Sequence, residues 1–113
     1  MTYFRAFEVE ALRLLGNAKL GSVVVEAICR DAEFVSYSHS GVGYFLTVRH
    51  HLLPNARMVL SKPVVLGQVG EVAGSYLAFV ENTELMLEYA GTTDVPENFR
   101  DLSVQVAAHS SAS

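Results

Sequence analysis

Three glutamates form the clearest acidic group in the sequence: Glu81, Glu84 and Glu88. A tight turn between Glu81 and Glu84 would bring two carboxylates close enough to share a proton or to hold a divalent cation. Turn residues are usually exposed to solvent, so we favour a solvated turn and outer strand face for them. The sequence therefore assigns no metal and no cofactor to this group.

Four histidines raise the question of a metal site, because imidazole is a common ligand of transition metals. His50 and His51 are neighbours, so on an extended strand their side chains point to opposite sides. No His-Glu-x-x-His spacing is present, and we expect structural or surface roles, with His51 the more exposed of the two. The alternative is a small hydrolase or isomerase in which one of these histidines, Glu81 or Glu84 serves as a general base in a concave pocket.

The single cysteine predicts a packing role. Cys29 alternates with Val23, Val25 and Ala27, as a small residue on the buried side of a strand does. One cysteine forms no internal disulfide, which favours a reducing, cytoplasmic location.

Residues 3–15 are the one segment with convincing helical periodicity. Thr2 is expected to cap the start of this helix, and Gly16 to end it. The apolar side chains at helical spacing are Phe4, Phe7, Ala11, Leu14 and Leu15. From residue 22 onward, β-branched and aromatic runs broken by Gly, Pro and Asn favour antiparallel strands. We expect strands near residues 22–30, 33–40, 43–50, 56–60, 63–69, 74–81, 84–90 and 99–107.

Residues 33–50 predict a hairpin whose register follows from its turn. Gly41 and Val42 suit a tight turn that begins with glycine. The opposite face of this hairpin carries Phe34 and Phe45 among serines, so a shift of one residue would mix its two faces. The pairs that face the core are then His39 with Tyr44, Tyr37 with Leu46, and Val35 with Val48.

Residues 74–90 predict a second hairpin, with its turn at Asn82 and Thr83. Its other face is expected to be partly aromatic and acidic, because Glu81 lies across from Glu84 there. The core-facing pairs are Val80 with Leu85, Ala78 with Leu87, and Tyr76 with Tyr89. The side chains beyond the two glutamates on the other face are Phe79, Met86, Leu77 and Glu88.

These elements predict an α+β fold in which one N-terminal helix packs on a curved, mostly antiparallel sheet of about six to eight strands. The pattern leaves open whether the sheet closes into a barrel. Residues 1–108 are expected to form one domain, and residues 109–113, which are mostly small and polar, a disordered tail.

The composition narrows the class of partner. The 113 residues include 8 basic and 12 acidic ones, for a net charge of −4 without a basic cluster, so nucleic acid is not expected as a partner. No apolar run approaches the ~20 residues that span a bilayer, and charges interrupt the N-terminal segment, so neither a membrane span nor a signal peptide is expected. An acidic surface does favour a basic protein partner.

Three segments carry a resemblance to known proteins: GVGYFLTVRHHLLP, GSYLAFVENTELMLEYAG and VPENFRDLSVQV, which cover most of residues 41–106. They resemble short uncharacterised bacterial proteins of the kind carried on mobile gene cassettes. The resemblance implies a compact, often oligomeric bacterial protein without an assigned activity, and it carries over no functional residue.

The leading hypothesis is a non-catalytic binding or interaction module rather than an enzyme. Its sheet pairs with a second copy, as a homodimer or higher oligomer, and presents a partly aromatic, acidic cleft to a small apolar ligand or a protein partner. Two other functions stay open: the hydrolase or isomerase described above, and an acidic inhibitor or antitoxin-like protein. The residues predicted to line the cleft are Tyr37, His39, Tyr44, Phe79, Glu81, Glu84, Met86 and Glu88.

Overall fold

The computed structural model describes residues 3–109, and its two helices come first along the chain. Helix α1 spans Ala6–Gly16 and helix α2 spans Ser22–Asp31. Six strands and a short 3-10 helix, η1, follow. Their bounds are β1 Glu33–His39, β2 Gly43–Arg49, β3 Met58–Val69, β4 Val72–Glu81, β5 Glu84–Gly91, η1 Phe99–Asp101 and β6 Gln105–His109.

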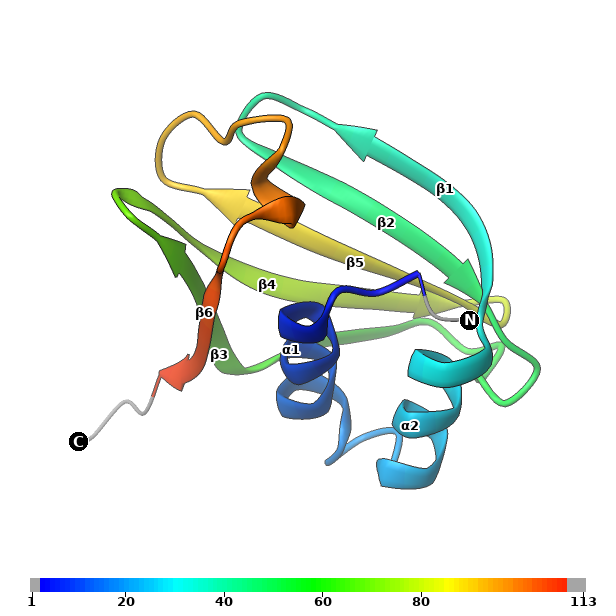
Figure 1. Cartoon of the computed structure of the whole chain (residues 1–113). Helices are drawn as coiled ribbons and strands as arrows, with labels where there is room; N and C mark the ends of the chain where they lie inside the picture. Colours follow the sequence, from blue (N-terminus) through cyan, green and yellow to red (C-terminus); the bar gives the residue numbers. More distant parts are fainter. Residues whose placement is uncertain (1–2, 110–113) are drawn as a thin grey trace.

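The six strands form one open, curved sheet (Figure 1). Their order is β1-β2-β5-β4-β3-β6, and every neighbouring pair is antiparallel. β1 and β6 are the two edges of the described sheet, so the sheet does not close into a barrel. Both helices lie on one face, which we call the helix face, and we call the opposite face the outer face. The expected α+β class is confirmed, with two helices instead of one.

Helix α2 replaces the strand that the sequence predicted at residues 22–30, and that prediction was wrong. Val25, Ile28 and Cys29 are buried at the i, i+3 and i+4 spacing of a helix face, whereas Val23 is 78% exposed. The valines have β propensity, but burial of this helix face in the core outweighs that preference.

Helix α1 ends at Gly16, as predicted, but begins later than predicted. The Glu8 carboxylate accepts a 2.8 Å hydrogen bond from the Arg5 backbone N–H, which satisfies a donor just before the first turn. The predicted cap, Thr2, lies outside the described residues. Glycine at position 16 also lets α2 approach, because a Cβ there would lie 2.9 Å from the Val25 side chain.

The hairpin of β4 and β5 has the predicted register throughout. Asn82 and Thr83 form its turn with φ of 53° and 60°, and two central residues with positive φ match the right-handed twist of the flanking strands. The turn is docked rather than free, since the Asn82 N–H donates to the Asn55 carbonyl at 3.0 Å and the Thr83 N–H to the Pro54 carbonyl at 3.1 Å.

The hairpin of β1 and β2 has the predicted turn but an interrupted register. The pairs nearest the turn match the prediction, whereas a bulge at Val35 makes Phe34 the partner of Val48. The predicted pair of Val35 with Val48 was therefore wrong. Phe34 consequently lies on the helix face, where its ring centroid is 5.2 Å from that of Tyr3.

The second half of the chain also differs from the prediction in three places. The strand expected at residues 99–107 is η1 followed by the short edge strand β6. His109, which was expected in the disordered tail, pairs with Val64 of β3. The rest of that predicted tail, residues 110–113, lies outside the described part of the chain. The two strands expected at 56–60 and 63–69 are one strand, β3.

The core fills the space between the helices and the helix face, and it has an aliphatic and an aromatic end. At the aromatic end, neighbouring ring centroids of Tyr44, Tyr76, Tyr89 and Phe99 lie 4.5 to 6.3 Å apart. Glycines make room for these rings: a Cβ on Gly74 would lie 2.7 Å from the Tyr89 ring. The buried carboxylate of Glu8 also lies at this aromatic end, where it accepts a hydrogen bond from the Tyr44 hydroxyl.

Candidate functional site

The outer face carries a broad set of apolar side chains. Strand pairing places Val59, Phe79, Met86 and Thr47 in one row across β3, β4, β5 and β2, because directly paired residues share a face. In Figure 1 both helices lie on the other side of the sheet. The apolar members of the outer face are Phe45, Val59, Val64, Leu66, Leu77, Phe79 and Met86.

Four of the predicted cleft residues line one hollow on the outer face. Phe79, Glu81, Glu84 and Met86 surround a space of about 170 Å³ together with Thr47, and we call it the acidic hollow. The hairpin register brings these side chains together, because Phe79 pairs with Met86 and Glu81 with Glu84.

Charge at the rim of the acidic hollow is partly compensated. Arg49 Nη2 donates a 2.6 Å hydrogen bond to Glu84, and this bond raises the pKa of the Arg49 guanidinium. Glu88 lies farther along β5, between Phe45 on β2 and Leu77 on β4. No ion pair forms on Glu88 within residues 3–109, so its carboxylate is an uncompensated charge between apolar neighbours.

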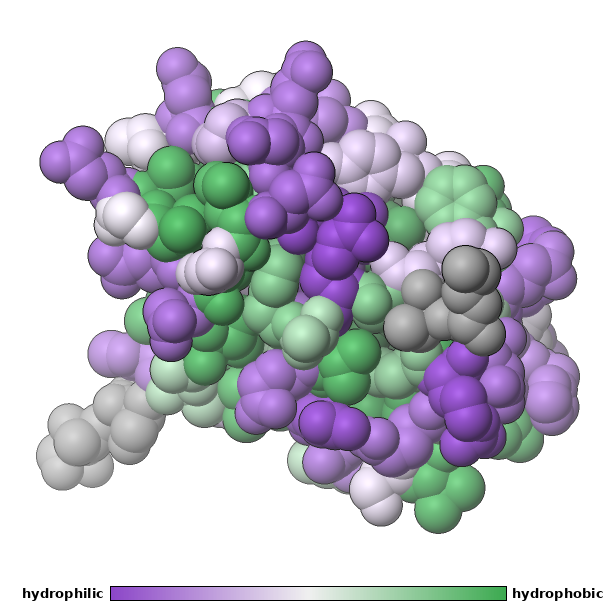
Figure 2. Space-filling model, viewed as in Figure 1, coloured by the Kyte–Doolittle hydropathy of each residue, from purple (hydrophilic) through white to green (hydrophobic). Residues whose placement is uncertain are grey.

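The other three predicted residues lie on the helix face, so the eight residues do not form one cleft. Tyr44 is fully buried, and Tyr37 is 38% exposed beside it, with ring centroids 5.8 Å apart. His39 lies at the end of β1, where its Nε2 is 2.8 Å from the Val95 carbonyl oxygen. The surface on this side mixes hydrophilic and hydrophobic residues (Figure 2).

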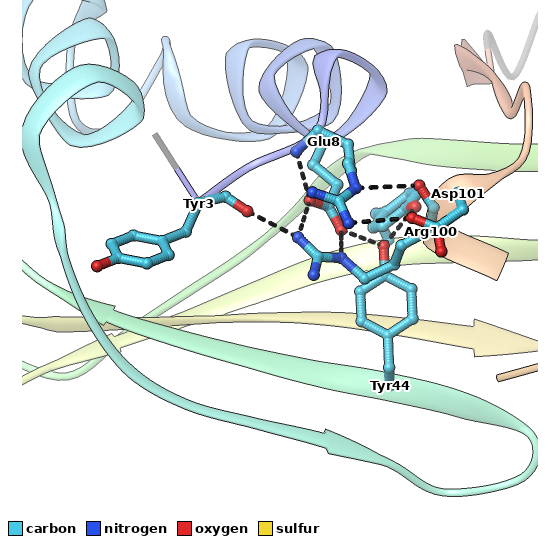
Figure 3. A network of polar contacts seen from close by, with 7 residues as sticks. Tyr3, Glu8, Tyr44, Arg100 and Asp101 are labelled. Atoms are coloured by element: carbon cyan, nitrogen blue, oxygen red, sulfur yellow. Dashed lines mark hydrogen bonds and ion pairs between the residues drawn. The ribbon is translucent and has the colours of Figure 1, made fainter. Parts of the chain in front are cut away.

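A buried carboxylate organises the polar cluster beneath that surface (Figure 3). Glu8 is fully buried. Its Oε2 accepts hydrogen bonds from the Tyr44 hydroxyl at 2.6 Å and from Arg100 Nε at 2.7 Å. Its Oε1 accepts from Arg100 Nη2 at 2.7 Å and from the Arg5 backbone N–H at 2.8 Å. We call Glu8, Tyr44, Tyr76 and Arg100 the polar cluster.

The polar cluster is hydrogen-bonded among its own members and to the backbone of Tyr3 and Arg5. Because Tyr44 donates to Glu8, its oxygen is free to accept from the Tyr76 hydroxyl, which lies 2.9 Å away. Burial raises the pKa of both tyrosines, with the Glu8 charge adding to the effect, so both hydroxyls keep their protons as donors. The Arg100 guanidinium lies 5.3 Å from the Tyr37 ring centroid and also donates to the Tyr3 carbonyl at 2.8 Å.

Sequence reasoning missed the polar cluster, although one of its members carried a signal. Glu8 falls on the apolar side of α1, spaced with Phe4, Ala11, Leu12 and Leu15 as residues of one helix face are. A glutamate in that position predicts a buried, paired carboxylate. Its partner carried no local signal, because it lies 92 residues later in the chain.

The two adjacent histidines do not point to opposite sides, as an extended strand would require. His50 follows the end of β2, and its ring stacks on that of His51 with a centroid distance of 4.6 Å. His51 is exposed, as predicted, whereas His50 is only 7% exposed. His50 Nδ1 accepts a 3.1 Å hydrogen bond from the Leu52 N–H.

This histidine pair lines a second hollow, of about 600 Å³, which we call the histidine hollow. Because Nδ1 accepts a hydrogen bond, the proton of the neutral His50 ring is on Nε2. Burial, together with the nearby His51, lowers the pKa of His50 and keeps the ring neutral. In this tautomer Nε2–H is a hydrogen-bond donor, and the Nδ1 lone pair is already used by the Leu52 N–H. The other residues of the histidine hollow are Asp31, Glu33, Arg49 and Thr83.

The described chain holds one cysteine, and it holds no cluster of metal-ligating side chains. Cys29 is buried in the core, as predicted, and burial raises the pKa of its thiol to about 11, so the thiolate is scarce at neutral pH. Within residues 3–109, no three His, Cys, Asp or Glu side chains come together as a metal site. Neither helix of the described chain is long and apolar enough to cross a membrane.

Comparison with protein-family models, with curated proteins and with solved structures finds no match to this chain. The resemblance to cassette-encoded bacterial proteins and the cytoplasmic location therefore stay predictions.

Proposed function

We propose that this chain is a non-catalytic interaction module that pairs with a second copy of itself through the outer face. The observation that carries the proposal is an uncovered sheet face with apolar residues on four neighbouring strands. Val59, Val64 and Leu66 are 38%, 48% and 42% exposed there. A contiguous apolar patch of this kind is typical of a protein interface.

The size of the outer face supports a stable pair. Six strands at a spacing of about 4.8 Å span about 24 Å, and a strand of the length of β4 spans about 30 Å, for a face of roughly 700 Å². A standard interface buries about 800 Å² on each partner. Sheet-on-sheet packing of two copies therefore gives an area of the size that specific association needs.

The acidic hollow fits a role inside such an interface. Its volume of about 170 Å³ is below the ~300–1,000 Å³ of typical small-molecule sites, and it suits one protruding side chain of a partner. The exposed strand β3 offers a complementary charge in Lys62, and the hollow offers Glu81. Two copies related by a two-fold axis would form each such contact twice.

The closed polar cluster supports the same proposal from the other side of the sheet. Every oxygen of Glu8 already accepts hydrogen bonds from the protein. None of the buried side-chain nitrogen and oxygen atoms in the described chain lacks a partner. This cluster therefore connects α1, β2, β4 and η1, and both oxygens of its carboxylate are already used by hydrogen bonds within the protein.

The proposal is tested by the oligomeric state of the chain in solution. Phe79 and Met86 pair across β4 and β5 at the centre of the apolar row, and replacing both with serine removes apolar area without touching the core. Hot-spot apolar residues each contribute ~2 kcal/mol or more, so Phe79→Ser with Met86→Ser should weaken dimerisation about a hundredfold or more. Sedimentation equilibrium over a wide concentration range measures this change.

The matched control is Val23→Ser, which removes an apolar side chain that is 78% exposed on α2, away from the outer face. We expect this variant to dimerise like the wild type, and both proteins to keep the wild-type circular dichroism spectrum. A wild-type chain that stays monomeric at the highest concentrations reached would refute the proposal.

A further inference from the structure

The histidine hollow gathers polar groups that the proposed dimer does not use, apart from Arg49, which also reaches Glu84 at the rim of the acidic hollow. Three chain segments meet there: the junction of α2 and β1, the end of β2, and the turn between β4 and β5. The last two are held together by the His50 N–H, which donates to the Thr83 carbonyl at 3.0 Å. The space of about 600 Å³ lies in the range of small-molecule sites.

His50 presents a fixed donor to this space. Its Nδ1 is occupied by the Leu52 N–H, and no residue of the described chain accepts a hydrogen bond from its Nε2–H. That nitrogen is not one of the buried atoms without a partner, so it is open to solvent despite the 7% exposure of the residue, and His50 lines the hollow. An occupant with an oxygen acceptor would complete its hydrogen bonding.

Arg49 offers further donors beside His50. Its Nη2 donates to Glu84 at 2.6 Å, but its Nη1 lies 3.7 Å from Glu33, which is beyond hydrogen-bond distance. The guanidinium therefore keeps N–H groups for an anionic oxygen. A carboxylate is a small group that can accept from an imidazole and a guanidinium together.

The same hollow also offers acceptors for a cation. Both contacts between Arg30 and Asp31 use Asp31 Oδ2, which leaves Oδ1 open. Glu33 has a carboxylate that is 72% exposed and has no ion pair shorter than 3.7 Å. Asp31 is the last residue of α2, where the negative end of the helix dipole adds to the attraction for a cation.

We propose that the histidine hollow binds a small zwitterion of the amino acid type, with its carboxylate on His50 and Arg49 and its ammonium on Asp31 and Glu33. Donors and acceptors are both open in one space, and a molecule that carries both charges can satisfy both sets. This site goes beyond the proposed dimer, because its hydrogen-bonding groups surround a hollow separate from the acidic hollow.

The test uses three probes that differ by one charged group: L-alanine, propionate, which lacks the ammonium, and ethylamine, which lacks the carboxylate. Backbone amide shifts of His51, Leu52 and Thr83 in two-dimensional NMR report binding at the hollow. We expect saturable binding of L-alanine, and affinities at least about tenfold weaker for the other two probes, because each loses charge-assisted hydrogen bonds.

Two substitutions test which residues bind the carboxylate of the ligand and which bind its ammonium group. His50→Asn keeps an oxygen that can accept from the Leu52 N–H but removes the Nε2–H, and it should weaken L-alanine about tenfold while ethylamine is unchanged. Glu33→Gln should weaken L-alanine and ethylamine but not propionate. The matched controls, His109→Asn and Glu88→Gln, change the same residue types away from the hollow and should leave all three affinities unchanged.

Three results would contradict the zwitterion site. Equal affinity for the three probes, no saturable shift with L-alanine, or unchanged binding in a folded His50→Asn variant would each overturn the zwitterion site. Sedimentation of the same variants keeps the two proposals apart, since loss of L-alanine binding is expected to leave the dimer intact.

Discussion

At the scale of single residues, the strongest constraint is the fully buried carboxylate of Glu8. Arg100 supplies two of its four hydrogen bonds and its only ion pair among residues 3–109. Removal of one member of a buried pair leaves an uncompensated charge, which costs about 3–5 kcal/mol. We therefore expect Arg100→Met to lower the free energy of unfolding in urea by about that amount.

A double variant tests whether the loss of stability in Arg100→Met comes from the unpaired charge of Glu8. Glu8→Met with Arg100→Met removes both charges together, and apolar replacement of a whole buried pair is often nearly neutral. It should therefore be more stable than Arg100→Met alone, with the difference measured in the same urea titrations. A double variant that is less stable than the single one would show that the hydrogen bonds to Glu8 from Tyr44 and the Arg5 N–H outweigh the cost of its uncompensated charge.

The burial and direction of a side chain could be predicted where the residue lies in one regular helix or strand. Glu8 lies on the apolar side of a regular helix, so its burial could have been read from spacing alone. The stacking of His50 on His51 could not, because the chain leaves β2 at His50 and turns. Alternation of side chains holds only while the backbone stays extended.

At the scale of elements, the turns were the most predictable feature. Gly41 and the Asn82–Thr83 pair mark both hairpins, and turn geometry then fixes which residues pair. The bulge at Val35 has no such marker, and it moved Phe34 from the outer face to the helix face. Helix α2 was missed because its valine run favours strands locally, whereas core packing on α1 decides its conformation.

Three glycines lie side by side on β3, β4 and β5, and their lack of a side chain leaves room for the aromatic rings of the core. Gly74 pairs with Gly67 on β3 and with Gly91 on β5, and a Cβ on it would clash with the Ala90 carbonyl oxygen and would lie 2.7 Å from the Tyr89 ring. Overpacking of this kind typically costs about 1–3 kcal/mol. We expect Gly74→Ala to lower the thermal unfolding midpoint by several degrees in scanning calorimetry.

The neighbouring position is the control for that substitution. Ser75 lies next to Gly74 on β4, and its side chain points to the outer face, where Ser75→Ala meets no ring. We expect little change in the midpoint for this variant. Equal midpoints for the two variants would contradict a packing role for the glycine row.

At the scale of the whole molecule, the decisive feature is that both helices pack on one face of the sheet (Figure 1). The sequence separates apolar from polar positions within each hairpin, but it does not say which face a helix covers. The apolar residues of the outer face, among them Phe45 and Phe79, are equally compatible with a second layer of the same chain. The path of α1 and α2 over the helix face is what leaves them uncovered.

Glu88 distinguishes a second copy from a basic partner at that face. Its carboxylate lies between Phe45 and Leu77 and has no ion pair among the described residues. In a symmetric pair of sheets both copies bury this charge, and desolvation of an unpaired charged group opposes association by more than ~1.4 kcal/mol. Glu88→Gln should therefore tighten the dimer about tenfold or more in sedimentation equilibrium.

Glu10→Gln is the matched control, because Glu10 is an exposed glutamate on α1, on the other side of the sheet. It makes the same change in net charge, so it separates the effect of position from the weaker general repulsion between two chains of charge −4. If Glu88→Gln instead weakened association, the carboxylate would be meeting a cation, and the natural occupant of the outer face would be a basic partner rather than a second copy.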